Sequence, residues 1–228
     1  MRVEIIGGMG VGKTSLCGTL EDLGFHCVYE ALEKNPYLEL SYEDPESFGF
    51  YSQLSFILGN FFTARQKQQK DEVTFFDYST VTDKAYSTLF LKGKGRDIAL
   101  QTIEFLEQKE GRSEVLLYLT CSPAVQLERI RSRNRQHETG VDLEFIRTLD
   151  SYIRHYVQIA ELEGANVITV DTEEIDLRND RGFVTSLGVE LNRMVNSPLT
   201  RFRPDAMNYT GFKRGASNDE KVLAYADA

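Results

Sequence analysis

The sequence comprises 228 residues, of which 41% are hydrophobic and 27% are charged. This composition is typical of a folded globular protein and excludes a chain that is too polar to build a core. The net charge of -9 argues against a nucleic-acid polymer as the partner, because phosphates repel an acidic surface.

The first twenty residues contain the most specific motif. An apolar stretch at 3–6 predicts a short strand, and helix-compatible residues follow from Ser15 onward. Between them, residues 7–14 match the pattern G-x-x-x-x-G-K-T of a phosphate-binding loop. Glycines let backbone N–H groups point at phosphate oxygens, and the helix that follows adds a positive partial charge. A purely structural glycine-rich turn is the alternative, and the order of strand, loop and helix disfavours it.

We therefore predict a triphosphate site in this loop. Lys13 would contact the β- and γ-phosphates, and the Thr14 hydroxyl would bind Mg²⁺. The predicted phosphate-binding residues of the loop are Gly7, Gly8, Met9, Gly10, Val11, Gly12, Lys13, Thr14 and Ser15.

Strands and helices then alternate along the chain. Further strands are predicted at 25–29, 73–76, 114–120 and 166–170, and helices at 48–70, 83–109 (two, divided at 92–95), from 123 onward, at 143–162 and at 182–194. This alternation predicts an α/β fold, a five-stranded parallel sheet with helices on both faces. Residues 1–197 are expected to form one domain, and the polar residues 198–228 a tail.

Neither the cysteines nor the apolar segments point outside the cytoplasm. Cys17, Cys27 and Cys121 lack metal-ligand spacing and are typical of a reducing compartment. We see no signal peptide and no apolar run long enough to span a bilayer, so we expect a cytoplasmic protein.

Two acidic residues and one basic segment are candidates for chemistry. Glu30 and Asp77 each follow a predicted parallel strand, at the edge where such sheets bind ligands; solvated surface charges are the alternative. Four arginines lie within residues 129–135 of an otherwise acidic protein. The alternative there is a basic helix end stabilised by the helix dipole.

Taken together, residues 1–194 resemble the deoxyribonucleoside kinases, the family that contains deoxycytidine kinase and deoxyguanosine kinase. The most specific match is the segment 42–53, which begins with Tyr42 and ends with Gln53. The resemblance implies that Tyr42 binds the sugar 3′-hydroxyl and that Gln53 reads the edge of the base, for which a carboxamide offers a donor and an acceptor. It also implies that Asp83 lies near the base.

The resemblance further implies the catalytic residues. Glu30 would be the general base, and Asp77 would hold Mg²⁺. The basic segment 129–135 resembles the family's lid, in which Arg129 and Arg133 would bind phosphate and Arg135 would act in catalysis. Glu138 would join Tyr42 on the 3′-hydroxyl.

One position departs from the family pattern. Tyr78 stands where the family has an arginine beside the 5′-hydroxyl, and a neutral phenol cannot stabilise the migrating phosphoryl group. Either Arg135 or Lys84 compensates, or the chemistry is slow, directed at a shifted substrate, or absent. The preferred base stays open, because it depends on positions that are small or polar here: Ser52, Asn60, Asp83 and Ser87.

The sequence thus predicts a P-loop kinase that uses ATP and Mg²⁺ to phosphorylate the 5′-hydroxyl of a deoxyribonucleoside. A nucleoside monophosphate kinase of the thymidylate kinase type is one alternative, and a non-catalytic nucleotide-binding protein is another. The expected partners are the nucleoside and the triphosphate, with no membrane and no nucleic-acid polymer, and we expect a homodimer.

Overall fold

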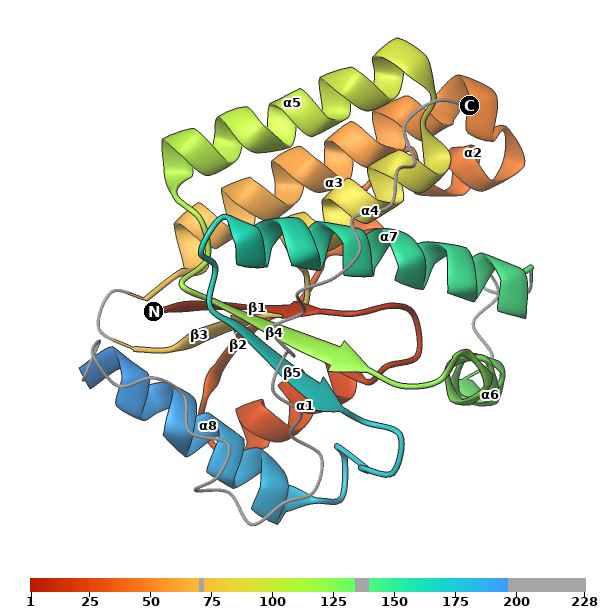
Figure 1. Cartoon of the computed structure of the whole chain (residues 1–228). Helices are drawn as coiled ribbons and strands as arrows, with labels where there is room; N and C mark the ends of the chain where they lie inside the picture. Colours follow the sequence, from red (N-terminus) through yellow and green to blue (C-terminus); the bar gives the residue numbers. More distant parts are fainter. Residues whose placement is uncertain (70–71, 134–139, 197–228) are drawn as a thin grey trace.

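Five parallel strands form the centre of the computed structural model, which describes residues 1–69, 72–133 and 140–196. The sheet order is β2-β3-β1-β4-β5, and every neighbouring pair runs parallel (Figure 1). The strands are β1 (Arg2–Ile6), β2 (His26–Val28), β3 (Thr74–Phe76), β4 (Val115–Thr120) and β5 (Val167–Asp171). The α/β prediction and the five expected strands are confirmed.

Helices cover both faces of this sheet. On one face lie α1 (Lys13–Asp22) and α8 (Arg181–Asn196); on the other lie α3 (Pro45–Lys67), α4 (Thr80–Phe90), α5 (Gly93–Glu110) and α7 (Leu143–Leu162) (Figure 1). Shorter elements, η1 (Leu32–Lys34) and α2 (Leu38–Glu43), follow β2, and α6 (Pro123–Arg133) follows β4. Fully buried apolar residues fill both interfaces, so the sheet is sandwiched between two cores.

Side-chain caps set where several helices begin. Asp44 accepts a hydrogen bond from the Ser47 amide and precedes Pro45, so α3 starts three residues earlier than the expected 48. Ser79 caps α4 in the same way. The expected break at 92–95 lies slightly earlier, because Gly93 already opens α5.

The structure also bears on the membrane prediction. Within the three described ranges, no helix is both long enough and apolar enough to cross a bilayer. The predicted tail, 198–228, lies outside the described residues.

Candidate active site

The phosphate-binding loop connects β1 to α1 in a shape that requires glycine. Gly10 and Gly12 have φ of +80° and +104°, in the left-handed region. A Cβ at Gly7 would lie 2.7 Å from the Leu119 carbonyl oxygen, so a larger residue there would clash with β4. Lys13 Nζ donates to the carbonyl oxygens of Gly7 (2.8 Å) and Gly8 (2.9 Å), which folds its ammonium group back over the loop.

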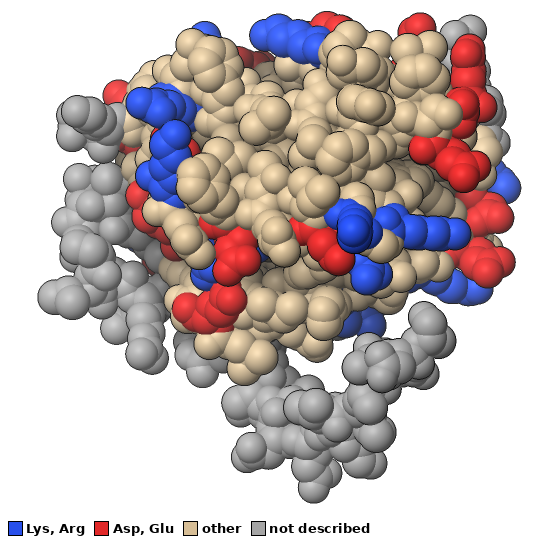
Figure 2. Space-filling view, turned by 90° about the horizontal axis from the view of Figure 1, so that it is seen from above, with Lys and Arg blue, Asp and Glu red and all other residues tan. Residues whose placement is uncertain are grey.

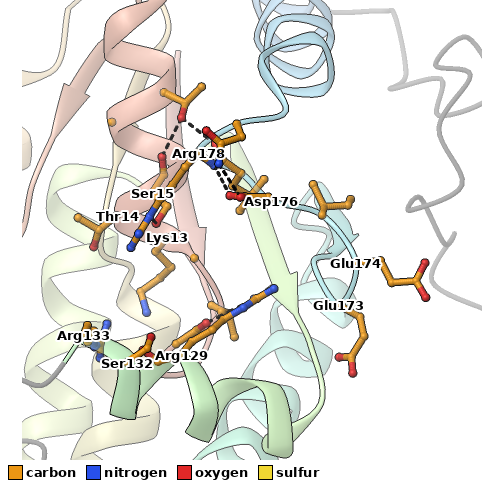
Figure 3. A pocket seen from close by; sticks show the side chains of 18 of the residues that line it. Lys13, Thr14, Ser15, Arg129, Ser132, Arg133, Glu173, Glu174, Asp176 and Arg178 are labelled. Atoms are coloured by element: carbon orange, nitrogen blue, oxygen red, sulfur yellow. Dashed lines mark hydrogen bonds between the residues drawn. The ribbon is translucent and has the colours of Figure 1, made fainter.

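A cavity of about 940 Å³ opens beside this loop. It is lined by residues 10–15 of the loop, by the end of α6 and by the segment 173–179, which follows β5 (Figure 3). The sequence reasoning did not select 173–179. Its position after the carboxyl end of a parallel strand, the same signal that selected Glu30 and Asp77, would have identified it.

Two of the predicted lid arginines line this cavity. Arg129 donates to the carbonyl oxygen of Thr172 (2.7 Å) and to its hydroxyl (3.2 Å), and the Thr172 hydroxyl donates in turn to the Val11 carbonyl of the loop (2.9 Å). Arg133 is the last residue of α6 and lies near Lys13 (Figure 3). The other two predicted residues, Arg135 and Glu138, lie outside the described residues.

The surroundings of Lys13 act on its pKa in opposite directions. Burial lowers its pKa, while the carboxylates of Asp77 and Glu30 act in the opposite direction. A cation in such surroundings gains from any further negative charge, which is what a triphosphate supplies.

Asp77 and Thr14 lie together, as the sequence predicted. The Thr14 hydroxyl donates to Asp77 Oδ2 at 2.6 Å, which connects the start of α1 to the end of β3. A hydroxyl and a carboxylate are hard oxygen donors, and Mg²⁺ prefers such donors while it keeps several of its own waters. The donor set therefore fits Mg²⁺.

Glu30 follows β2 and is partly buried. Burial raises its pKa to about 7, although the nearby Lys13 ammonium and a hydrogen bond from Asn60 act to lower it. A carboxyl group with a pKa near neutrality is suited to accept a proton at physiological pH.

Asp83 lies in the first turn of α4 and is buried. Both of its carboxylate oxygens accept hydrogen bonds from Asn60 Nδ2, at 3.2 and 3.3 Å. Burial, followed by the proximity of Glu30, raises the pKa of Asp83 well above its usual range. Asn60 therefore contacts both carboxyl groups, a contact that the sequence did not predict.

Tyr78 points into a small apolar cluster, with Val28, Ala64 and Phe76. Only 4% of its surface is exposed, and its hydroxyl donates to the backbone carbonyl of Asn60 at 3.1 Å. The suggestion that Lys84 replaces the missing arginine is wrong in this structure, because Lys84 Nζ is bound by both oxygens of Glu107 (2.9 and 3.0 Å).

The two remaining predicted residues lie on neighbouring helices. Tyr42 is on α2, with 54% of its surface exposed, and Gln53 is on α3 and partly buried. Their contacts with a nucleoside stay predictions.

Comparison with known proteins places this geometry in context. Residues 3–196 match the family model described as "Deoxynucleoside kinase". A deoxyadenosine kinase of Dictyostelium discoideum is 28% identical over 164 residues, which cover 69% of this chain and 66% of that protein. A deoxyadenosine/deoxycytidine kinase of Bacillus subtilis is 26% identical over 205 residues, covering 81% of this chain and 88% of that protein. The chain thus spans just under two thirds of the length of the first relative and most of the second.

A solved structure shares the fold. The deoxyadenosine kinase of M. mycoides, determined with dCMP and dCDP, superposes with a TM-score of 0.67 at 20% sequence identity, covering 82% of this chain and 98% of that one.

Proposed function

Because this chain belongs to the deoxynucleoside kinase family, we propose that it transfers the γ-phosphoryl group of ATP to the 5′-hydroxyl of a deoxyribonucleoside. One observation above all supports this proposal. The loop with Lys13, the Thr14–Asp77 pair and Glu30 lie at the carboxyl ends of three neighbouring strands, β1, β3 and β2. A phosphate cradle, a metal-binding pair and a proton acceptor are the parts that phosphoryl transfer to a hydroxyl needs.

Each group has a role in this proposal. Lys13 and Arg133 neutralise charge on the phosphoryl oxygens, and Arg135 adds to this from the lid. Glu30 accepts the proton of the 5′-hydroxyl. Thr14 and Asp77 hold Mg²⁺, which neutralises phosphate charge when bound.

The nucleoside would lie on the side of α3 and α4. Gln53 and Asp83 would contact the base, and Tyr42 and Glu138 the 3′-hydroxyl. A site that hydrogen-bonds a hydroxyl rejects analogues that lack it, so 2′,3′-dideoxynucleosides should be poorer substrates than deoxynucleosides.

The direct test is a panel of nucleosides incubated with labelled ATP and Mg²⁺, with identification of the products. A 5′-monophosphate is expected from at least one deoxynucleoside, and Lys13→Ala should abolish it while far-UV circular dichroism remains unchanged.

The other outcomes identify the alternatives. A protein that converts only monophosphates to diphosphates is a kinase of the thymidylate kinase type. A protein that binds ATP without any product is a non-catalytic nucleotide-binding protein. Either result would refute the proposal.

We also propose that two copies pair through one face of α3 and α5. Seen from above, with α5 uppermost, the surface carries a broad uncharged area with charges gathered toward its edges (Figure 2). Large apolar side chains are 48–62% exposed on these helices: Leu58 and Phe62 on α3, and Ile98 and Phe105 on α5. A patch of this kind is uncommon on a monomer, and pairing with a second copy would cover it.

We also propose that residues 1–197 form the kinase domain and 198–228 a polar tail, and that the protein acts in the cytoplasm.

A further inference from the structure

We propose that Asn60 is a positioning residue that couples recognition of the nucleobase to the orientation of the catalytic base, Glu30. The inference rests on the proposed function, since it takes Glu30 as the proton acceptor and Asp83 as a contact of the base. It adds a role for the carboxamide that lies between these two carboxyl groups.

The first observation is the geometry of the Asn60 side chain. Its Nδ2 donates to Asp83 Oδ1 at 3.2 Å and Oδ2 at 3.3 Å, and its side chain lies close enough to Glu30 to lower the pKa of that carboxyl group. An amide nitrogen carries two hydrogens, enough to serve one carboxyl group with each. The side chain is only 7% exposed, so water cannot readily take over either contact.

The second observation concerns Tyr78. Its hydroxyl donates to the backbone carbonyl of Asn60 at 3.1 Å, and its ring packs edge to face on Phe76 with centroids 5.5 Å apart. The residue that replaces the expected arginine therefore holds the turn of α3 from which the Asn60 side chain extends. In this chain a phenol holds the backbone of Asn60, and the side-chain amide of Asn60 binds Asp83 and lies near Glu30.

A consequence for specificity follows from this shared amide. A base that engages Asp83 in the right geometry leaves Nδ2 between the two carboxyl groups, so Glu30 stays aimed at the 5′-hydroxyl. A base that displaces Asp83 moves the amide as well and misplaces Glu30. An unsuitable base would then be penalised in kcat, because the proton acceptor is misaligned, and not only in KM.

The test compares the best and the poorest deoxynucleoside of the panel as substrates for wild type and Asn60→Leu, a variant of similar size without donors. The expected result is a kcat at least tenfold lower with the best substrate, an unchanged KM for ATP, and a smaller kcat ratio between the two nucleosides. Tyr78→Phe, which loosens Asn60 without removing its amide, should shift the same quantities in the same direction by a smaller factor.

Asn35→Leu is the matched control. Asn35 is also a buried asparagine, 8% exposed, and its Nδ2 donates to the carbonyl (3.0 Å) and hydroxyl (3.1 Å) of Ser52 on α3. It should lower thermal stability comparably. Because Ser52 is one of the positions named for base preference, the nucleoside KM values can change, but the kcat ratio between nucleosides, which reports on Glu30, should stay the same. If Asn60→Leu does not fold, Asn60→Ser provides the same comparison.

Four results would overturn the inference. Asn60→Leu could raise only the nucleoside KM, which would make Asn60 a simple contact. The two asparagine variants could alter kcat ratios alike, which would make its role structural. A wild type that phosphorylates no nucleoside would refute the proposed function itself, whereas an active wild type with an unchanged ratio in Asn60→Leu would refute the coupling alone.

Discussion

At the scale of single residues, Glu30 shows how burial prepares a side chain for proton transfer. Its pKa rises from 4.5 to about 7 because loss of water outweighs the attraction of Lys13 and the hydrogen bond from Asn60. The sequence indicated Glu30 by its place after a strand, but this balance depends on neighbours from β3, α1 and α3, which no local pattern reveals.

The pKa of Glu30 predicts the pH dependence of activity. The carboxylate form accepts the proton, so kcat/KM should rise as pH increases through about 7 and then level off. Glu30→Gln should lower kcat by roughly two orders of magnitude or more and remove this rise. Initial rates between pH 5.5 and 9 check both effects, and a wild-type profile that is flat across pH 7 would exclude Glu30 as the base.

The same pKa predicts an opposite effect on stability. The folded-state pKa of Glu30 is raised above its unfolded value. Below pH 4.5 Glu30 therefore does not reduce the free energy of unfolding, and it reduces it progressively as pH rises to about 7. Glu30→Gln avoids this loss and should be more stable than wild type above pH 7, by on the order of 3 kcal/mol. Urea unfolding at pH 4 and pH 8 measures the difference, which should appear only at the higher pH.

Tyr78→Arg tests the departure from the family pattern. Tyr78 is buried among apolar side chains, and this burial raises its pKa although the nearby Arg2 cation acts to lower it. A second guanidinium at this position would therefore be desolvated and repelled by Arg2. We expect a loss of about 3 kcal/mol or more in stability and lower activity on every nucleoside. Thermal unfolding and the nucleoside panel check this. A uniform increase in kcat would instead mean that the new side chain reaches the phosphoryl group.

At the scale of elements, side chains of α6 and α7 pack against the phosphate-binding loop at Gly8. A Cβ at Gly8 would lie 2.5 Å from Asp150 Oδ1 on α7 and 2.7 Å from Gln126 Oε1 on α6. Gln126 Nε2 donates to Asp150 Oδ2 at 2.6 Å, so the two side chains form one support.

This contact predicts the effect of a small substitution in the loop. Gly8→Ala should raise the KM for ATP several-fold while the nucleoside KM stays unchanged, because the added methyl group displaces the loop from its support. Adding Asp150→Ala should recover part of the loss. Gly95→Ala, where the nearest atom outside the helix is 3.6 Å away, is the control and should change neither KM.

The same elements show what the sequence could predict. The order of strands and helices followed from apolar periodicity, and α7 begins and ends at the expected residues, 143 and 162, because an apolar stripe and the Asp142 cap both mark it. The segment 173–179 follows the carboxyl end of β5, a position that the sequence could have indicated, but it was missed because it carries no motif of its own. The Asn60 contacts were missed because they join α3 to β2 and α4, which are far apart in sequence.

At the scale of the whole molecule, the apolar face of α3 and α5 gives the prediction on assembly. Phe62→Asp and Phe105→Asp each place a charge in the proposed contact, so each should convert a dimer to a monomer. Sedimentation velocity at micromolar concentration checks this. Leu162→Asp changes a side chain on α7 that is 88% exposed, and should leave the dimer intact. A monomeric wild type would refute the pairing.

The position of β1 in the centre of the sheet has a consequence for how the protein is made. Its two neighbours come much later in the chain, since Arg2 pairs with Thr74 and Val3 pairs with Val115. During synthesis the first strand must therefore wait for β3 before it gains its first partner, and its other edge stays unpaired until β4 has left the ribosome. Such distant pairings slow folding. A nascent chain that stops before Thr120 cannot support the loop, so ATP binding should appear late in translation and all at once.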